Sequence, residues 1–264
     1  MTSQERVVNG LQVEYQLAAN EGSGHPLLFV HGAWSGSWLF SEYLLYLSAG
    51  GWNCFAMNLR GHYKNAPLDD QARVTLSDYA RDIIGVAQLL PAPPVLIGYG
   101  TGAHIVQLAL SKGVAAVGAV FISAKLPDYS AQVIPPAVLK MPRLIPSDPL
   151  KPAPDIHPDI LDQLNDRRLN ALEPRAILVE LVSPQNRAMP EHVSVPYLVL
   201  NGELDEDISP EQGRLLAEYF RGPGAFDLIP GASHLGILVG SEWQEAANAL
   251  HAWLVTRHFN EPAS

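Results

Sequence analysis

The chain has 264 residues, a formal net charge of −10 and 47% hydrophobic residues. A chain of this length can form a single α/β domain with a large core. The acidic charge argues against nucleic acid and an anionic membrane as partners, because both require a basic surface. No run reaches the roughly 18 apolar residues that span a bilayer. We therefore expect a small-molecule substrate as the partner, and the sequence also allows a homodimer.

The cellular compartment is indicated by the N-terminus and by cysteine usage. The first six residues are polar and no apolar segment follows them, so we expect no secretory signal. A single cysteine, Cys54, excludes an internal disulfide and is typical of a reducing cytoplasm. Because Cys54 lies in an apolar run, we interpret it as a buried core thiol. The sequence predicts a cytoplasmic protein.

Short apolar runs alternate with longer amphipathic runs along the chain. The short runs predict strands at 11–17, 27–30, 52–58, 95–98, 117–123, 197–201 and 226–229. The amphipathic runs predict helices at 38–47, 76–90, 101–112, 210–220 and 242–258. Continuous apolar strands separated by helices are typical of a mostly parallel sheet that is covered on both faces.

One long stretch departs from this alternation. Residues 126–196 hold 13 of the 22 prolines and only two broken helical patterns, at 158–170 and 173–182. Prolines at this density interrupt regular elements, which favours an insertion over the sheet. We expect a core made of residues 1–125 and 197–264, with residues 126–196 forming a cap or lid.

A buried apolar run leads directly into a glycine-rich helix start near position 100. It fits the pattern Gly-x-Ser-x-Gly, in which a strand turns sharply into a helix and presents a nucleophilic serine. Gly98 and Gly102 occupy the two small positions, and Gly100 stands where the serine belongs. A frame shifted by one residue would make Thr101 the nucleophile, but Tyr99 would then fill a small position. The sequence predicts an elbow at Gly100 whose nucleophilic side chain is absent.

A second loop follows the apolar strand at 27–30. In acyl-transfer sites a glycine-containing loop at this point directs backbone N–H groups towards a developing oxyanion, together with the N–H after the nucleophile. The candidate donors are therefore Ala33 or Trp34, with Thr101. Trp34 and Tyr99 are also candidates for the wall of a binding pocket. We interpret the neighbouring His31 as a packing residue of the loop.

Two further strand ends carry an acid and a histidine, where ligands bind in open α/β sheets. His234 lies between small residues after the last strand, which leaves its ring free for proton transfer. An acid at the end of the preceding strand can orient that histidine. Asp205 is our choice, but Glu203, Glu206 and Asp207 share its loop.

The order of elbow, acid and histidine at 100, 205 and 234 resembles that of the α/β-hydrolase fold family, over nearly the whole chain. The runs Phe29-Val30-His31-Gly32-Ala33-Trp34 and Asn58-Leu59-Arg60-Gly61-His62 resemble its small-esterase, hydroxynitrile-lyase and methylesterase members. The resemblance implies an eight-stranded sheet, a cap domain, His234 as base and Asp205 as its orienting acid. It does not imply esterase activity, because the residue that would carry the acyl group is absent. Relatives continue with Gly-x-Ser where this chain has Tyr63-Lys64, which would add bulk and charge beside the pocket.

Three interpretations of Gly100 remain open. In the first, a serine was replaced in an active esterase or lactonase by engineering, which leaves a protein that binds substrate but scarcely turns it over. In the second, Gly100 is native, and His234 activates a water molecule or takes a proton directly from the substrate, in hydrolysis or a lyase reaction. In the third, the chain is a binding protein or receptor derived from a hydrolase.

We expect an enzyme, because a pure binding protein has no use for an oriented base. The substrate would be a small or medium apolar ester, lactone or ketone. The histidines and acids lack the spacing of metal ligands, and no Gly-x-Gly-x-x-Gly motif follows the first strand. We therefore expect neither a metal nor another cofactor.

Overall fold

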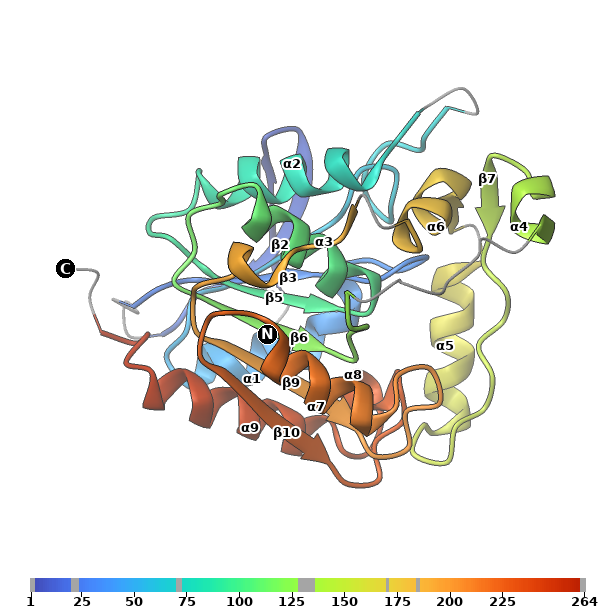
Figure 1. The fold of residues 1–264 in the computed structure, drawn as a ribbon. Coiled ribbons are helices and arrows are strands. Elements are labelled where there is room, and N and C mark those ends of the chain that lie inside the picture. Colours follow the sequence, from blue (N-terminus) through green and yellow to red (C-terminus); the bar gives the residue numbers. More distant parts are fainter. Residues whose placement is uncertain are drawn as a thin grey trace.

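A central sheet of eight strands organises the computed structural model, which describes residues 3–19, 24–69, 73–127, 136–169, 171–183 and 186–261 (Figure 1). The strand order is β1-β2-β4-β3-β5-β6-β9-β10. β1 pairs antiparallel with β2, β2 pairs antiparallel with β4, and all other neighbours in this sheet are parallel. The predicted eight-stranded, mostly parallel sheet is confirmed. The strands are β1 (Gln4–Val8), β2 (Leu11–Gln16), β3 (Leu27–Val30), β4 (Cys54–Met57), β5 (Val95–Tyr99), β6 (Gly118–Ile122), β9 (Tyr197–Gly202) and β10 (Gly224–Ile229).

Helices cover both faces of this sheet, as the continuous apolar strands predict. One face carries α2 (Leu76–Ala87), α3 (Thr101–Ser111) and α7 (Pro210–Tyr219), and the other carries η1 (Ser37–Phe40), α1 (Ser41–Ala49), α8 (Gly236–Val239) and α9 (Trp243–Thr256) (Figure 1). The β3 strand shows why both faces need cover. Its four residues are fully buried, and alternate side chains enter the two separate hydrophobic cores.

Between β6 and β9, the elements from α4 to α6 lie beyond the carboxyl ends of β5 and β6 (Figure 1). Its proline-rich sequence forms short elements instead of long ones. β7 and β8 pair antiparallel and form a second, two-stranded sheet. The elements are α4 (Pro136–Lys140), β7 (Leu144–Pro146), α5 (Pro158–Arg168), β8 (Leu172–Pro174), α6 (Arg175–Leu181) and η3 (Pro190–His192).

Local sequence signals account for several helix starts. The Thr75 hydroxyl accepts a hydrogen bond from the Asp78 N–H, and the Asp78 carboxylate accepts one from the Thr75 N–H, so α2 begins with a capping box. Pro158 and Pro210 stand at the first positions of α5 and α7, where the missing N–H of proline costs nothing. Among the described residues, no helix is long and apolar enough to cross a membrane.

The structure adds elements that the apolar pattern did not predict. β1 was missed because its residues 4–7 are exposed at the edge of the sheet, so the strand has no apolar alternation. The short elements α4, α8, β7 and β8 have too few residues for a periodic signal. The predicted helix at 38–47 is instead the 3-10 helix η1 followed by α1.

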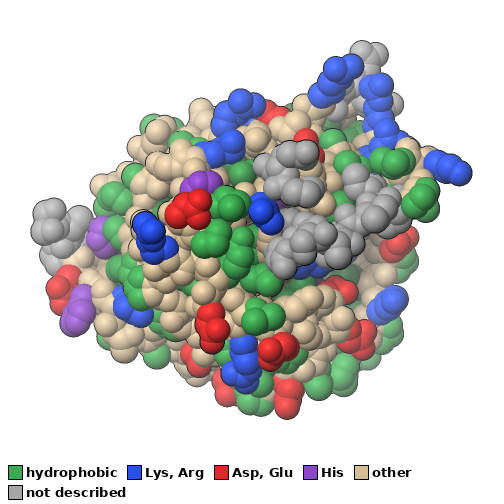
Figure 2. All heavy atoms as spheres, in the orientation of Figure 1, with side chains coloured by type: hydrophobic (Ala, Val, Ile, Leu, Met, Phe, Trp, Pro, Cys, Tyr) green, Lys and Arg blue, Asp and Glu red, His purple; other side chains and the backbone are tan. Residues whose placement is uncertain are grey.

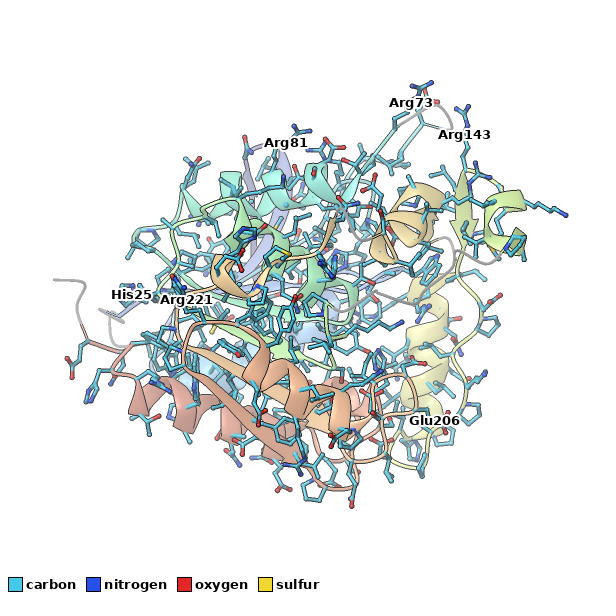
Figure 3. All side chains as sticks on the ribbon, viewed as in Figure 1. His25, Arg73, Arg81, Arg143, Glu206 and Arg221 are labelled. Carbon is cyan, nitrogen blue, oxygen red and sulfur yellow. The ribbon has the colours of Figure 1, made fainter. Side chains whose placement is uncertain are left out.

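Charge is distributed unevenly over the surface. In the view of Figure 2, Lys and Arg side chains gather at the upper right, and Asp and Glu side chains are concentrated along the lower side. The labelled Arg73 and Arg143 belong to the basic region and the labelled Glu206 to the acidic one (Figure 3). The net charge of −10 is therefore compatible with a locally basic region near α6.

Candidate active site

The turn from β5 into α3 is built at Gly100, which has φ 53° and ψ −118°. This left-handed backbone strongly favours glycine. A Cβ atom on Gly98 would lie 2.5 Å from the Cα of Ala103, and a Cβ on Gly102 would lie 2.3 Å from the carbonyl oxygen of Val30. Both positions therefore require glycine, and the sharp turn falls on Gly100 and not on Thr101.

His234 and Asp205 are brought together from the ends of β10 and β9. The His234 Nδ1 atom lies 2.9 and 3.0 Å from the two carboxylate oxygens of Asp205. Asp205 is buried, and its Oδ1 atom also accepts hydrogen bonds from the N–H groups of Asp207 and Ile208. Because this carboxylate only accepts, Nδ1 must donate its proton, which leaves a lone pair on Nε2.

The other acids of this loop do not contact Nδ1. Glu203 accepts a hydrogen bond from the Gly231 N–H, and Glu206 is exposed. Asp207 places its Oδ2 atom 3.9 Å from the His234 Nε2 atom, on the opposite side of the ring from Asp205. Of the four acids, Asp205 is therefore the one whose carboxylate contacts Nδ1 in the described part of the chain.

The Nε2 atom of His234 faces the elbow. A Cβ atom built on Gly100 would lie 3.8 Å from this Nε2 atom, and apart from the chain neighbours Tyr99 and Thr101 no other described residue comes within 4 Å. The Tyr99 ring packs against the imidazole with its centroid 5.2 Å away. A small reacting group could thus lie between Gly100 and the base.

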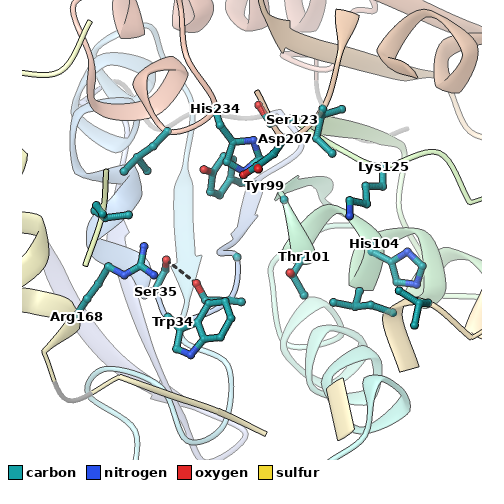
Figure 4. Close-up of a pocket in the computed structure, with 18 residues that line it drawn as sticks. Trp34, Ser35, Tyr99, Thr101, His104, Ser123, Lys125, Arg168, Asp207 and His234 are labelled. Carbon is teal, nitrogen blue, oxygen red and sulfur yellow. Dashed lines mark hydrogen bonds and ion pairs between the residues drawn. The ribbon is translucent and has the colours of Figure 1, made fainter. Parts of the chain in front are cut away.

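The sequence left open which backbone N–H groups could donate to an oxyanion. Ala33, Trp34 and Thr101 all line the same pocket (Figure 4). The Trp34 N–H donates to the Oε2 atom of Glu173 over 3.3 Å, and Trp34 has a left-handed φ of 53°. No hydrogen bond of the Ala33 or Thr101 N–H is found among the described residues. The N–H groups of Ala33 and Thr101 are therefore the better candidates for oxyanion donors, because the Trp34 N–H already donates to Glu173 of the segment between β6 and β9.

The pocket between these groups has a volume of about 480 Å³. Its walls combine the elbow and the oxyanion loop with residues of the segment between β6 and β9, called the cap segment below (Figure 4). Apolar side chains supply much of the lining, as is usual for small-molecule sites. They are Leu150, Leu181, Val182, Ile208 and Leu235. Two cationic side chains, Lys125 and Arg168, also line it.

A buried cluster of hydrogen bonds around Glu173 connects the cap segment to the core. The Glu173 carboxylate lies 3.0 Å from the His62 Nε2 atom and accepts a hydrogen bond from the Tyr79 hydroxyl as well as from Trp34. Burial alone would lower the pKa of His62, but the charge and hydrogen bond of Glu173 outweigh it and raise that pKa. The raised pKa favours the protonated form of His62, in which it is a cation that pairs with Glu173. Glu173 could not be predicted from the sequence, because its partners are distant along the chain.

His31 has a structural role beside the oxyanion loop. Burial and the neighbouring His62 lower the pKa of His31 to about 3, so His31 is neutral. Its Nε2 atom accepts a hydrogen bond from the Leu59 N–H, as a packing role requires.

The expectation for Lys64 was wrong: its ammonium group pairs with Glu5 and Glu14 and does not line the pocket. The hairpin of β1 and β2 supplies these acids, and β1 was not predicted.

Comparison with known proteins identifies the family. The sequence profile of the Alpha/beta hydrolase family matches residues 27–249. The chain belongs to the α/β hydrolase family. A search of curated proteins found no match to this chain.

Solved structures of esterases and lipases share the fold of this α/β hydrolase. A thermophilic esterase from Thermogutta terrifontis with bound malate superposes with a TM-score of 0.72 at 18% identity, covering 98% of this chain and 100% of the esterase. A monoacylglycerol lipase from Paleococcus ferrophilus gives a TM-score of 0.72 at 18% identity, covering 97% of this chain and 100% of the lipase. At this identity the similarity establishes the fold alone.

The Glu173 cluster generates a stability prediction. Replacing Glu173 with alanine leaves the His62 cation buried without its partner, and we expect the free energy of unfolding to fall by about 3–5 kcal/mol. Urea denaturation at pH 6 measures this change. The exposed Glu191 is a control in the same segment, and its replacement with alanine should cost no more than about 0.5 kcal/mol. Equal small losses in both variants would contradict the cluster's role.

The raised pKa of His62 also predicts a pH dependence. A group whose pKa is raised on folding stabilises the protein fully below its unfolded pKa of about 6.5, and this contribution is lost as pH rises through the folded value. The stability difference between the parent and His62→Gln should therefore be largest at pH 6 and shrink towards pH 9. Urea denaturation of both proteins across this range is the measurement. A difference that stays constant or grows with pH would show that His62 is not charged in the folded state.

Proposed function

We propose that this α/β hydrolase uses the His234–Asp205 pair as a general base and acts without a covalent acyl intermediate. The substrate is a small or medium-sized apolar ester, lactone or ketone. One observation carries the proposal: Nδ1 of His234 is held by a buried carboxylate, while Nε2 faces the position of Gly100, which has no side chain. An oriented base with an accessible lone pair is the requirement for proton abstraction.

In the proposed reaction, Nε2 of His234 takes a proton from a water molecule whose oxygen forms a bond to the carbonyl carbon of an ester. The carbonyl electron pair moves to its oxygen, and the N–H groups of Ala33 and Thr101 donate hydrogen bonds to the resulting oxyanion. When the oxyanion collapses, the bond from carbon to the leaving oxygen breaks. The imidazolium then gives its proton to that oxygen. The products are a carboxylic acid and an alcohol.

The space at Gly100 supports a role for water in this reaction. A polar site needs about 30 Å³ per water molecule and two or more polar partners. The missing hydroxymethyl group of a serine would leave room of this order, with Nε2 of His234 beside it. With a ketone, the same attack would break a carbon–carbon bond and deliver the proton to carbon.

The cap segment and the structural relatives support an ester substrate. Residues of α5 and α6 close one side of the pocket, so we assign residues 126–196 a lid function that controls access. The structural relatives include proteins described as an esterase and a monoacylglycerol lipase. These descriptions make an ester the first substrate class to test.

The base assignment predicts which side chains control turnover. His234→Ala should lower kcat for 4-nitrophenyl butyrate by about 10²–10⁴-fold, because the base is lost. Asp205→Asn should also lower kcat, because an amide no longer fixes the Nδ1 proton. Glu206→Gln is the matched control, since Glu206 lies one residue further on and is exposed (Figure 3). The assay is steady-state release of 4-nitrophenolate, corrected for buffer hydrolysis.

A different pattern in that assay would change the assignment. Equal losses in Asp205→Asn and Glu206→Gln would refute the role of Asp205. Binding of the ester without turnover by the parent would favour a binding protein derived from a hydrolase.

A second candidate is a serine hydrolase in which glycine replaces the nucleophile. It is favoured by the elbow itself, because a Cβ at position 100 would lie 3.8 Å from Nε2 and, apart from its chain neighbours, no other described residue comes within 4 Å. Gly100→Ser should therefore show a burst of 4-nitrophenolate and become labelled by an alkyl phosphonate. The serine would occupy a strained φ, so the free energy of unfolding should fall by about 1–3 kcal/mol. A variant that folds but shows neither burst nor labelling would exclude this ancestry.

A further inference from the structure

Arg168 is a cation that the proposed reaction does not use. It lies at the last position of α5 in the cap segment and lines the pocket together with Tyr99 and His234 (Figure 4). Its Nε atom is buried and has no hydrogen-bond partner among the described residues. A buried donor without an acceptor is uncommon in folded proteins, and each such donor calls for a specific explanation.

The charge of Arg168 is only partly balanced by its surroundings. Burial lowers its pKa, and the groups that oppose this effect are Tyr99 and the exposed Asp148. No ion pair of Arg168 within 4.0 Å is present in the described part of the chain. An arginine remains protonated at neutral pH under these conditions. The pocket therefore contains a guanidinium group with donors available for an anion.

The adjacent Arg167 does not share the position of Arg168 in the pocket wall. Arg167 carries the same charge on the same helix, but its guanidinium lies 5.6 Å from the centroid of the Trp38 ring and does not line the pocket. Of the two arginines that end α5, only Arg168 can contact a molecule in the pocket.

Lys125 adds a second positive charge on the opposite side of the pocket (Figure 4). The nearby His104 is neutral, because burial, with a smaller contribution from the charge of Lys125, lowers its pKa to about 4. Asp207 is the acidic group of the pocket wall and lies beside Nε2 of His234. An anionic group would be repelled from the base and attracted towards the two cations.

We propose that the substrate carries a carboxylate in addition to its ester or lactone group, and that Arg168 binds this carboxylate. The planar guanidinium can donate two parallel hydrogen bonds to a carboxylate, which fixes the orientation of the ligand. The carboxylate lies at Arg168, the apolar chain lies against the leucine and valine side chains, and the ester carbonyl reaches the Ala33 and Thr101 N–H groups. This inference rests on the proposed function for the reacting end of the substrate. The anion site itself can be tested without turnover.

Calorimetry with monomethyl glutarate tests the anion site directly, with dimethyl glutarate as the neutral probe. The parent should bind monomethyl glutarate more tightly than the dimethyl ester, and Arg168→Gln should weaken monomethyl glutarate binding by about tenfold or more. Arg167→Gln, which removes the same charge outside the pocket, should leave the affinity unchanged. Equal affinity of the parent for both probes, or equal losses in the two variants, would overturn the proposal.

A kinetic arm separates the carboxylate preference from the reaction. The two esters are mono(4-nitrophenyl) glutarate and 4-nitrophenyl valerate, which differ in the terminal carboxylate. The parent should favour the glutarate ester in kcat/KM through a lower KM, and this ratio should fall about tenfold in Arg168→Gln. A preserved ratio would overturn the carboxylate site. If the parent binds monomethyl glutarate but hydrolyses neither ester, the proposed reaction fails while the anion site stands.

Salt provides a test on the unmodified protein. Raising NaCl from 0.05 to 0.5 M shortens the screening length to less than half. The affinity for monomethyl glutarate should then fall by more than that for dimethyl glutarate. An identical salt response of the two probes would contradict binding by the guanidinium, even if Arg168→Gln could not be folded.

Discussion

The hydrogen bond between His234 and Asp205 is the interaction on which the proposed chemistry of this site depends. It fixes the proton on Nδ1 and leaves Nε2 as the acceptor that faces Gly100. Asp205 can do this because two backbone N–H groups hold its carboxylate in place and its side chain is buried. The fold delivers both residues at the ends of neighbouring parallel strands, where the elbow and the oxyanion loop also lie. A base is thus oriented in a site whose nucleophile position holds no side chain.

The Glu173 cluster connects this site to the segment that covers it. One carboxylate pairs with the His62 cation and also accepts a hydrogen bond from the Trp34 N–H. The cap segment therefore contacts the loop to which we assign the oxyanion donors, and movement of the cap would change that loop. Arg168 comes from the same segment and brings positive charge to the pocket. In the proposed reaction, both the oxyanion loop and the carboxylate site therefore depend on the position of the cap segment.

The sequence predicted those features that depend on local backbone constraints. Gly98 and Gly102 could be interpreted from spacing alone because each prevents a backbone clash. The edge strand β1 was missed because exposed edges carry no apolar pattern. The choice of Asp205 needed coordinates, since four acids share one loop and only geometry separates them. Glu173 could not be found from the sequence, because a buried ion pair joins residues that are 111 positions apart.

Intact-protein mass spectrometry shows whether the oriented base works without a covalent intermediate. Samples would be quenched in acid while the protein hydrolyses 4-nitrophenyl butyrate. If the base acts through water, product should form faster than in buffer while the mass of the protein stays that of the unmodified chain. An acyl adduct on the protein during turnover, or product formation no faster than in buffer, would contradict this mechanism.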